Sequence, residues 1–533
     1  MILIKDFLST MSVADYFSMS SLSGCVSRCR QSRRLVLLIV YVTLLLDNML
    51  LTTVVPIIPN FLRQIENTRK AALLSSVSNI NYTCVSRSLS AASNASQDGQ
   101  GISNVLRHYV MHTSHPLCVN FTGNMSDLSN QTKPENDQEP FADQNIQVGL
   151  LLASKAIIQL LVNPFIGPIT NRIGYNIPLI VGLVIILVST VVFAFGESYI
   201  VLLVARAVQG IGSSCASVAG MSMLADQYVD DKERGNAMGI ALGGLAMGVL
   251  IGPPFGGIMF EFAGGKEAPF LILAGLAILD ILLQLFALQP KVKRESQEGA
   301  PLKTLLSDPY ILLAAASLTL GTTSIAMLDP SLPIWMYETM HAVEWQQGMA
   351  FLPGSISYLI GTSIFGPLSY RIGRWLSAMI GLFLNGISVI CIPFSKTMAH
   401  LIAPVFGLGL ALGMVDCAMM PHMGYLVDLR HVSVYGSVYA IADIALCLGY
   451  AIGPSISGSI VKEIGFNWSM WIIGIINIIY APFMYFLQNP AAKEEKMVLI
   501  MKDPSPVQYI TYNQNRYSKP SSDKGTLKTT TTH

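Results

Sequence analysis

The sequence is poor in charge, and this excludes most classes of soluble protein. Charged residues make up 12% of the 533 positions, about half of the roughly 25% that is usual in a soluble domain. The 33 Lys and Arg nearly balance the 32 Asp and Glu, so the chain lacks the basic excess of a nucleic-acid-binding protein. Hydrophobic residues reach 52%, which excludes disorder over most of the chain. The composition predicts an integral membrane protein.

The chain also lacks the residue spacings that metal sites and enzyme sites require. Its eight cysteines include no CxxC pair, so the combined CxxC and HxxxH pattern of a structural zinc site is missing. We find no nucleophile–base pair of the kind that a membrane enzyme needs. We therefore predict no enzymatic activity, no metal and no cofactor.

Runs of about twenty apolar residues recur along the chain, each long enough to cross a bilayer as a helix. The predicted spans are 35–58, 146–167, 177–195, 199–222, 236–260, 268–288, 309–329, 347–367, 376–394, 400–423, 434–460 and 467–487. This pattern predicts an all-α membrane protein of twelve transmembrane helices. It excludes a seven-helix receptor.

Two sequence patterns occur twice, about 200 residues apart. Residues 165–174 (FIGPITNRIG) are echoed by residues 364–373 (IFGPLSYRIG), and a Gly-x3-Gly-Pro pattern at Gly248 returns at Gly449. Parallel repeats of this kind predict two six-helix halves. The predicted parts are an N-terminal tail (1–34), a first half (35–289), a linker (290–308), a second half (309–488) and a C-terminal tail (489–533).

The distribution of arginines and sequons predicts the orientation. Arg28, Arg30, Arg33 and Arg34 precede the first span, so both termini and the linker should be cytoplasmic. Residues 60–143 then form a long loop on the opposite side, where glycosylation is expected. Its Asn-x-Ser/Thr sequons begin at Asn81, Asn94, Asn120, Asn124 and Asn130, and Cys84 and Cys118 in the same loop could pair.

Ionisable residues inside the predicted spans form the main candidate site. They are Asp47, Lys155, Arg206, Asp280, Asp329, Asp416 and Asp443. Each costs about 2.5–3.5 kcal/mol at a helix centre, so we expect them to share a polar cavity and to neutralise one another. Asp280 in the sixth span is the exception, and a structural role is equally open for it. Carboxylates in such a cavity suit a protonated amine and reversible proton binding. Aromatic residues that could surround a cation are Trp335, Phe351, Tyr358, Tyr425 and Tyr450.

Three motifs resemble signatures of the major facilitator superfamily. The turn motif Gly167–Gly174 has Asn171 in place of the usual acid, and Arg206–Gly212 is similar to the fourth-helix signature. Gly239–Gly257 resembles the antiporter signature of the fifth helix, where small residues would let helices approach closely. The resemblance implies the major facilitator fold and transport by alternating access.

Longer stretches resemble the vesicular amine transporters. The stretches Leu44–Leu50, Ala153–Lys155, Gly413–Asp416 and above all Asp428–Asp443 carry this likeness, and Phe351–Gly361 is similar to the monoamine branch. The resemblance implies exchange of cytoplasmic serotonin, dopamine, noradrenaline, adrenaline or histamine for protons of an acidic secretory or synaptic vesicle. It also implies a protein that functions as a monomer.

The same resemblance assigns roles to individual residues. Asp47 and Asn48 would bind the amine, helped by Asp329, Trp335, Tyr358 and Tyr450. Lys155 and Asp443 would form an ion pair, and Asp416, Asp329 and Arg206 would join the proton-coupling network. Phe351, Trp335, Tyr358, Tyr425 and Tyr450 would gate the site.

The chain departs from the family pattern at three positions. Asp329 replaces a Glu, Thr322 replaces an Asn, and His341 replaces a cysteine that the family bonds to its first luminal loop. In the tail, Glu495, Leu499 and Ile500 are similar to an acidic dileucine signal that would bind sorting adaptors. Two alternatives stay open, namely a vesicular acetylcholine transporter and a plasma-membrane drug:proton antiporter.

Overall fold

The structure is a computed structural model that describes residues 32–55, 57, 139–263, 265–287 and 301–491. Several predictions lie outside these residues and are not addressed by it. They concern the five sequons, the pair Cys84 and Cys118, and the sorting signal at Glu495, Leu499 and Ile500.

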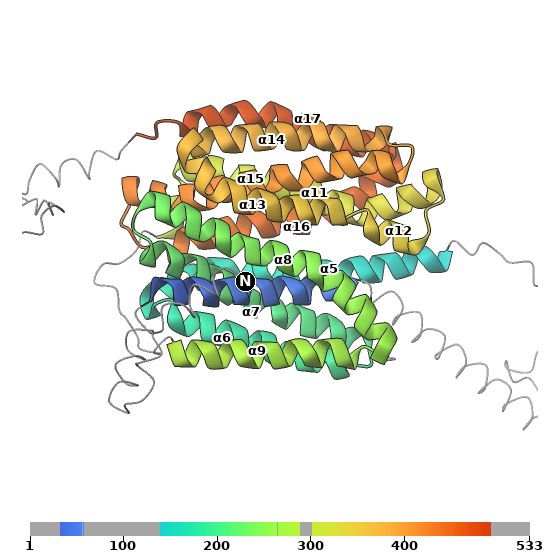
Figure 1. Ribbon diagram of the computed structural model, residues 1–533, viewed down its shortest axis with the longest axis horizontal. Helices are drawn as coiled ribbons and strands as arrows, with labels where there is room; N and C mark the ends of the chain where they lie inside the picture. Colours follow the sequence, from blue (N-terminus) through green and yellow to red (C-terminus); the bar gives the residue numbers. More distant parts are fainter. Residues whose placement is uncertain (1–31, 56, 58–138, 264, 288–300, 492–533) are drawn as a thin grey trace, which may run out of the picture. The chain divides into compact units, whose positions relative to one another are not determined.

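The described chain is helical, and twelve of its helices are long and apolar enough to cross a membrane. The first span is Arg33–Val55, drawn in blue in Figure 1. The helices of the first half that follow are α5 (Glu139–Ile173), α6 (Asn176–Phe195), α7 (Tyr199–Gln227), α8 (Asp231–Ala263) and α9 (Glu267–Ala287). Those of the second half are α10 (Leu302–Leu306), α11 (Pro309–Met340), α12 (Glu344–Met349), α13 (Leu352–Ile372), α14 (Arg374–Cys391), η2 (Ile392–Phe394), α15 (Met398–Arg430), α16 (Gly436–Ile464), α17 (Phe466–Tyr480) and η3 (Ala481–Leu487).

All twelve predicted spans are confirmed, but several predicted ends are wrong. The seventh span was expected to end at residue 329, whereas α11 continues through Pro330 and Pro333 to Met340. Likewise α15 reaches Arg430 rather than 423. Proline is tolerated inside membrane helices because neighbouring groups satisfy the freed backbone, and polar ends can extend the helix beyond the hydrocarbon. Hydropathy therefore located each helix but not its ends.

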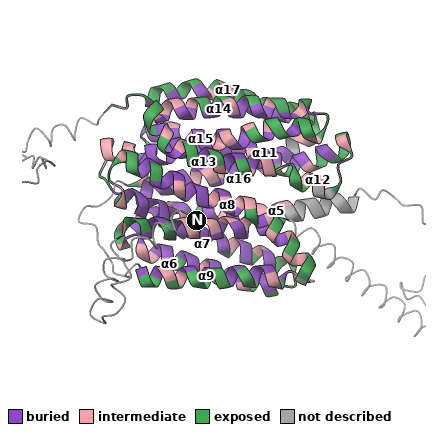
Figure 2. Cartoon of the chain, viewed as in Figure 1, coloured by how far each residue is buried: buried purple, intermediate pink, exposed green. Residues whose placement is uncertain are grey.

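The outer faces of the bundle are apolar and exposed. Leu279 and Leu282 on α9 are 62% and 56% exposed, and Ile479 on α17 is 63% exposed. Figure 2 shows exposed positions along these outer helices. Such faces are unfavourable in water and favourable against lipid tails.

The repeated Gly-x3-Gly-Pro pattern brings helices together in the same way in both halves. In the first half, a Cβ on Gly248 of α8 would clash with the carbonyl oxygen of Leu45 in the first span. In the second half, a Cβ on Gly453 of α16 would lie 2.5 Å from Cβ of Ala326 in α11. No real Cβ has that space, so only glycine permits these contacts, as the sequence predicted.

The other repeated motif ends two helices with the same turn. Gly174 after α5 and Gly373 after α13 have φ of 85° and 96°, which only glycine adopts readily. The two halves then meet along two helix pairs, because α5 packs against α16 and α8 packs against α13. The site lies between these pairs.

Candidate functional site

A buried ion pair lies at the centre of the first half. Lys155 Nζ on α5 lies 3.0 Å from both carboxylate oxygens of Asp47 on the first span. Ser213 on α7 donates a third hydrogen bond to Asp47 Oδ1 at 2.5 Å. Both charged side chains are less than 10% exposed. A buried carboxylate thus accepts bonds from one ammonium and one hydroxyl, which is the donor set that a protonated amine could replace.

Asp443 on α16 has a different set of partners from the one predicted. Gln159 and Asn163, on α5, donate to Asp443 Oδ2 at 2.8 and 2.7 Å. The predicted Lys155–Asp443 ion pair is not formed in this conformation, because the ammonium of Lys155 is held by Asp47. Gln159 lies one helical turn after Lys155, so the two carboxylates are reached from successive turns of α5. Lys155 neutralises Asp47, and Asp443 is bonded to two amides of the same helix.

Arg206 on α7 is almost fully buried, at 1% exposed. It donates to Gln209 at 2.6 Å and to the backbone carbonyl of Leu51 at 3.0 Å, while its guanidinium lies 5.9 Å from the ring of Phe193. Its bonds thus run to an amide and a carbonyl rather than to an acid. The backbone contact fixes α7 against the first span a turn beyond Asp47.

A second acidic group lies in the other half. Tyr358 on α13 donates to Asp416 on α15 at 2.8 Å, and both residues are buried. Asp329 on α11 is exposed, and Tyr450 on α16 is 37% exposed. A carboxylate that faced lipid within a membrane span would be very unfavourable, which indicates that Asp329 faces the interior of the bundle. Asp416 and Asp329 thus occupy contrasting environments.

Asp280 is apart from these groups. It accepts a 2.9 Å bond from Thr43 on the first span, and Gln284 on α9 donates to Thr43 at 3.0 Å. This cluster joins α9 to the first span. Of the two roles left open, the contacts favour a structural one.

Of the predicted aromatic residues, only Tyr358 contacts one of the acids directly. Trp335 stacks on Phe466 of α17 with ring centroids 4.9 Å apart, and Phe351 packs against the same apolar cluster of the second half. Tyr425 lies beside His422, at 5.7 Å between centroids.

One end of the bundle carries ion pairs between the two halves; we call it the Arg33 end, since Arg33 begins the first span there. Arg234 on α8 lies 2.6 Å from Asp428 on α15. Arg374 on α14 lies 2.8 Å from Asp231 on α8. Within the described residues, both ion pairs that cross between the halves lie at this end. They hold it closed.

Asp308 forms a further cluster at the Arg33 end, within the second half. Its carboxylate accepts bonds from Arg430 Nε at 2.6 Å and from the backbone of Tyr310 at 3.1 Å, and His431 Nε2 lies 2.9 Å away. Burial opposes ionisation, but the bonds from His431 and Arg430 outweigh it, and the pKa of Asp308 is lowered to about 2. Asp308 thus anchors the start of α11 to the end of α15.

Sequence reasoning missed several partners of the charged residues. Gln159 and Asn163 follow Lys155 at intervals of four, so this polar stripe on one face of α5 could have been recognised. Ser214 donates to Asn163 and extends this network to α7. Ser213 and Ser214 gave no signal, because serine is common in membrane helices. Among the described residues, no group of three His, Cys, Asp or Glu side chains is placed to hold a metal ion.

The arrangement of two six-helix halves around buried acids and one lysine agrees with the comparison to known families. The profile of the Major Facilitator Superfamily matches residues 138–428 and 319–503. The human synaptic vesicular amine transporter is 56% identical over 491 residues, which cover 91% of this chain and 94% of that protein. This chain belongs to the vesicular amine transporter family. Both the predicted family and the predicted fold are confirmed.

Other members of the family are more distant. The human chromaffin granule amine transporter is 51% identical over 490 residues, which cover 89% of this chain and 91% of that protein. The vesicular acetylcholine transporter of Torpedo marmorata is 38% identical over 489 residues, with 90% and 87% covered. These relatives are transporters of vesicle membranes, so this family member is a multi-pass vesicle membrane transporter rather than an enzyme.

A solved structure supports the fold alone. The human organic anion transporter MFSD10 superposes with a TM-score of 0.64 at 15% identity, covering 86% of this chain and all of that one.

Proposed function

We propose that the chain loads protonated monoamines into acidic vesicles in exchange for protons, and that Asp47 binds the amine. The observation that carries this proposal is the buried Asp47–Lys155–Ser213 cluster. Lys155 places an ammonium group where the amine of a substrate would bind. A cavity that already holds an alkylammonium against a carboxylate has the charge and hydrogen-bond geometry for another.

The hydrogen bonds to Asp47 favour a monoamine over acetylcholine. Its carboxylate accepts directional bonds from an N–H and an O–H donor at 2.5–3.0 Å. A primary or secondary ammonium can supply such donors, whereas a quaternary ammonium has none and depends on aromatic faces.

Lys155 gives the proposal a route for coupling. When a substrate ammonium displaces it from Asp47, Lys155 can turn toward Asp443, which its neighbour Gln159 already contacts at 2.8 Å. The arriving positive charge favours loss of a proton from Asp443. The predicted Lys155–Asp443 pair then belongs to the substrate-bound state. Asp416, with Tyr358, is a second proton carrier, and Asp329 is a further acid of the same network.

The Arg33 end is proposed to be cytoplasmic, because Arg28, Arg30, Arg33 and Arg34 lie before or at the start of the first span. Since the two ion pairs between the halves close that end, this conformation is closed toward the cytoplasm. Glycosylation would then lie on the luminal loop, and the sorting signal with its adaptors in the cytoplasmic tail. Phe351, Trp335, Tyr358, Tyr425 and Tyr450 are kept as gating candidates.

The deciding experiment is uptake of radiolabelled serotonin and acetylcholine into vesicles expressing the chain, with an imposed pH gradient. Serotonin should accumulate, and dissipating the gradient should abolish the accumulation. Acetylcholine accumulation would assign the other branch of the family, and accumulation without a gradient would contradict proton exchange.

The orientation has its own test. Glycosidase treatment should shift the band toward the 57.8 kDa chain mass, and the shift should vanish when the five loop asparagines are replaced. An unchanged band would place residues 60–143 in the cytoplasm.

A further inference from the structure

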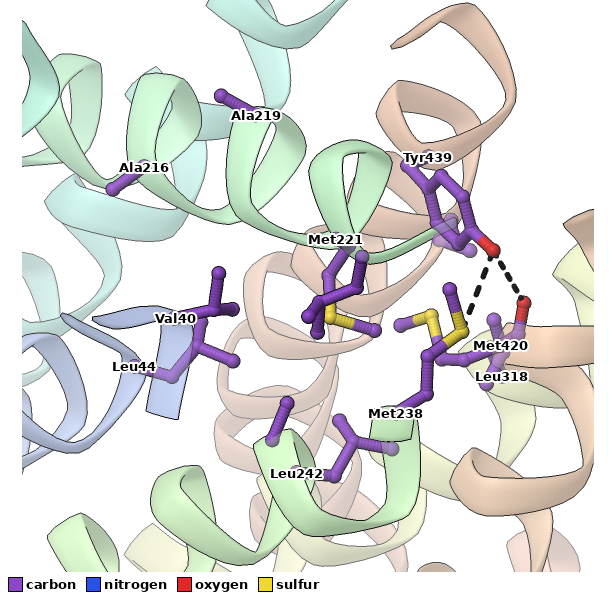
Figure 3. Close-up of a cluster of buried hydrophobic side chains, with 14 of the residues drawn as sticks. Val40, Leu44, Ala216, Ala219, Met221, Met238, Leu242, Leu318, Met420 and Tyr439 are labelled. Carbon is purple, nitrogen blue, oxygen red and sulfur yellow. Dashed lines mark hydrogen bonds between the residues drawn. The ribbon is translucent and has the colours of Figure 1, made fainter. Parts of the chain in front are cut away.

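A cluster of methionine side chains lies where the two halves meet (Figure 3). It contains Met221 of α7, Met238 of α8 and Met420 of α15, which are 5%, 0% and 4% exposed. Tyr439 of α16 lies among them and donates to the sulfur of Met238 at 3.4 Å and to the carbonyl of Met420 at 3.2 Å. We call Met221, Met238 and Met420 the methionine cluster.

The methionine cluster lies directly behind the ion pairs of the Arg33 end. Met238 follows Arg234 by one turn of α8, and Tyr439 follows Tyr435 by one turn of α16. Arg234 pairs with Asp428, to which Tyr435 also donates, at 2.7 Å. The thioethers are therefore dry only while the first half (α7, α8) contacts the second (α15, α16).

Alternating access changes the environment of these sulfurs. If the halves part at the Arg33 end, the methionine cluster lines the cytoplasmic passage and meets water and its solutes. A thioether that is accessible to a peroxide is oxidised to a sulfoxide, whereas one packed in an apolar core is protected. The conformational cycle would thus decide whether the cluster can react.

We propose that Met221, Met238 and Met420 are a state-dependent oxidation site that inactivates the transporter. In each event a sulfur lone pair attacks hydrogen peroxide, the O–O bond breaks, one oxygen becomes the sulfoxide, and the peroxide is reduced to water. The new S=O group is polar and must be buried when the halves close again. The hydroxyl of Tyr439 has one proton, which is already shared between Met238 and Met420, so it cannot satisfy three sulfoxide oxygens. Closure at the Arg33 end becomes unfavourable, which traps the open state. The inference rests on the proposed alternating access.

The first test compares two triple variants. Met221→Leu/Met238→Leu/Met420→Leu removes the sulfurs with little change in apolar volume, so uptake before oxidation should be largely retained. The control Met327→Leu/Met336→Leu/Met470→Leu changes three methionines, at most 4% exposed, that are buried within the second half alone. Hydrogen peroxide should lower uptake about tenfold in the parent and in the control, and less than about twofold in the cluster variant. Methionine sulfoxide reductases should restore uptake.

An equal loss of uptake after peroxide treatment in the two triple variants would overturn the inference. Recovery of uptake with a thiol reductant alone would also overturn it, because it would point to cysteine oxidation.

The second test measures oxidation directly, as the mass of one added oxygen on each methionine. Substrate with a pH gradient should speed oxidation of the methionine cluster several-fold and leave Met336 unchanged. Oxidation rates of the methionine cluster that do not change with substrate and a pH gradient would also overturn the inference. If serotonin uptake in the same vesicles is intact, the proposed function still stands.

Discussion

The middle of the bundle and its Arg33 end both hold buried charges, but they pair them differently. At the Arg33 end, each arginine has its own acid across the two halves: Arg234 with Asp428 and Arg374 with Asp231. In the middle, the one lysine, Lys155, lies near two acids and is bonded to only one of them. An arginine that has its own acid stabilises one conformation, whereas a lysine with a second acid close by can exchange partners. The charge pairing of the Arg33 end therefore suits a closed end of the bundle, and that of the middle suits a binding site.

The largest expected effect comes from removing the acid that Lys155 occupies. Asp47→Asn leaves a buried ammonium uncompensated, which costs about 3–5 kcal/mol and should abolish serotonin uptake. Asp280→Asn is the matched control, because its amide can still accept the bond from Thr43. It should keep most of the uptake. Similar uptake by the two variants would remove the distinction between a binding acid and a structural one.

Coupling should depend next on the acid of the second half. Asp416→Asn mimics the protonated form at every pH, so accumulation driven by a pH gradient should fall about a hundredfold while amine binding persists. Tyr358→Phe removes only the 2.8 Å bond and should have a smaller effect. Binding and uptake of the same labelled amine distinguish these outcomes. Unchanged gradient dependence in Asp416→Asn would make the residue structural.

A smaller effect is expected from opening the Arg33 end. Asp428→Asn breaks the ion pair with Arg234 and should shift the population toward the state open at that end, by about tenfold. Ser437, which is 1% exposed and accepts a bond from Asn171, reports the change when replaced by cysteine. A membrane-impermeant thiol reagent should then label Ser437→Cys faster in the presence of Asp428→Asn. Asp47→Asn should not produce this increase, and if it does, the two regions are not separable.

The smallest effect concerns the Asp308 cluster. Its folded-state pKa of about 2 lies below the unfolded value of about 3.9. The ionised carboxylate therefore stabilises the fold above about pH 4, and that contribution is lost as the pH falls through about 2. The melting temperature of the parent should be insensitive to this group between about pH 5.5 and 7.5. Asp308→Asn should lower it by a few degrees throughout that range. A difference between parent and variant that vanishes at pH 5.5 would contradict the lowered pKa of Asp308.

Much of the architecture was predictable from the sequence. Each span is marked by about twenty apolar residues, and the glycine pattern predicted that helices approach closely at these positions, although not which helices they are. The ends of α11 and α15 were not predictable, because proline and charged residues near a helix end read as stop signals. The polar stripe of Lys155, Gln159 and Asn163 was visible in the sequence, but its partners were not.

Composition and periodicity by themselves determined that this chain is a twelve-helix membrane protein with two related halves, because hydropathy and small-residue patterns are local properties. They also identified the buried acids and the single central lysine. Only the tertiary structure decided that Lys155 bonds to Asp47 rather than to Asp443, and that arginine–acid pairs close one end of the bundle. Those pairings join residues more than a hundred positions apart, and the partner of a buried charge is set by which helices pack together.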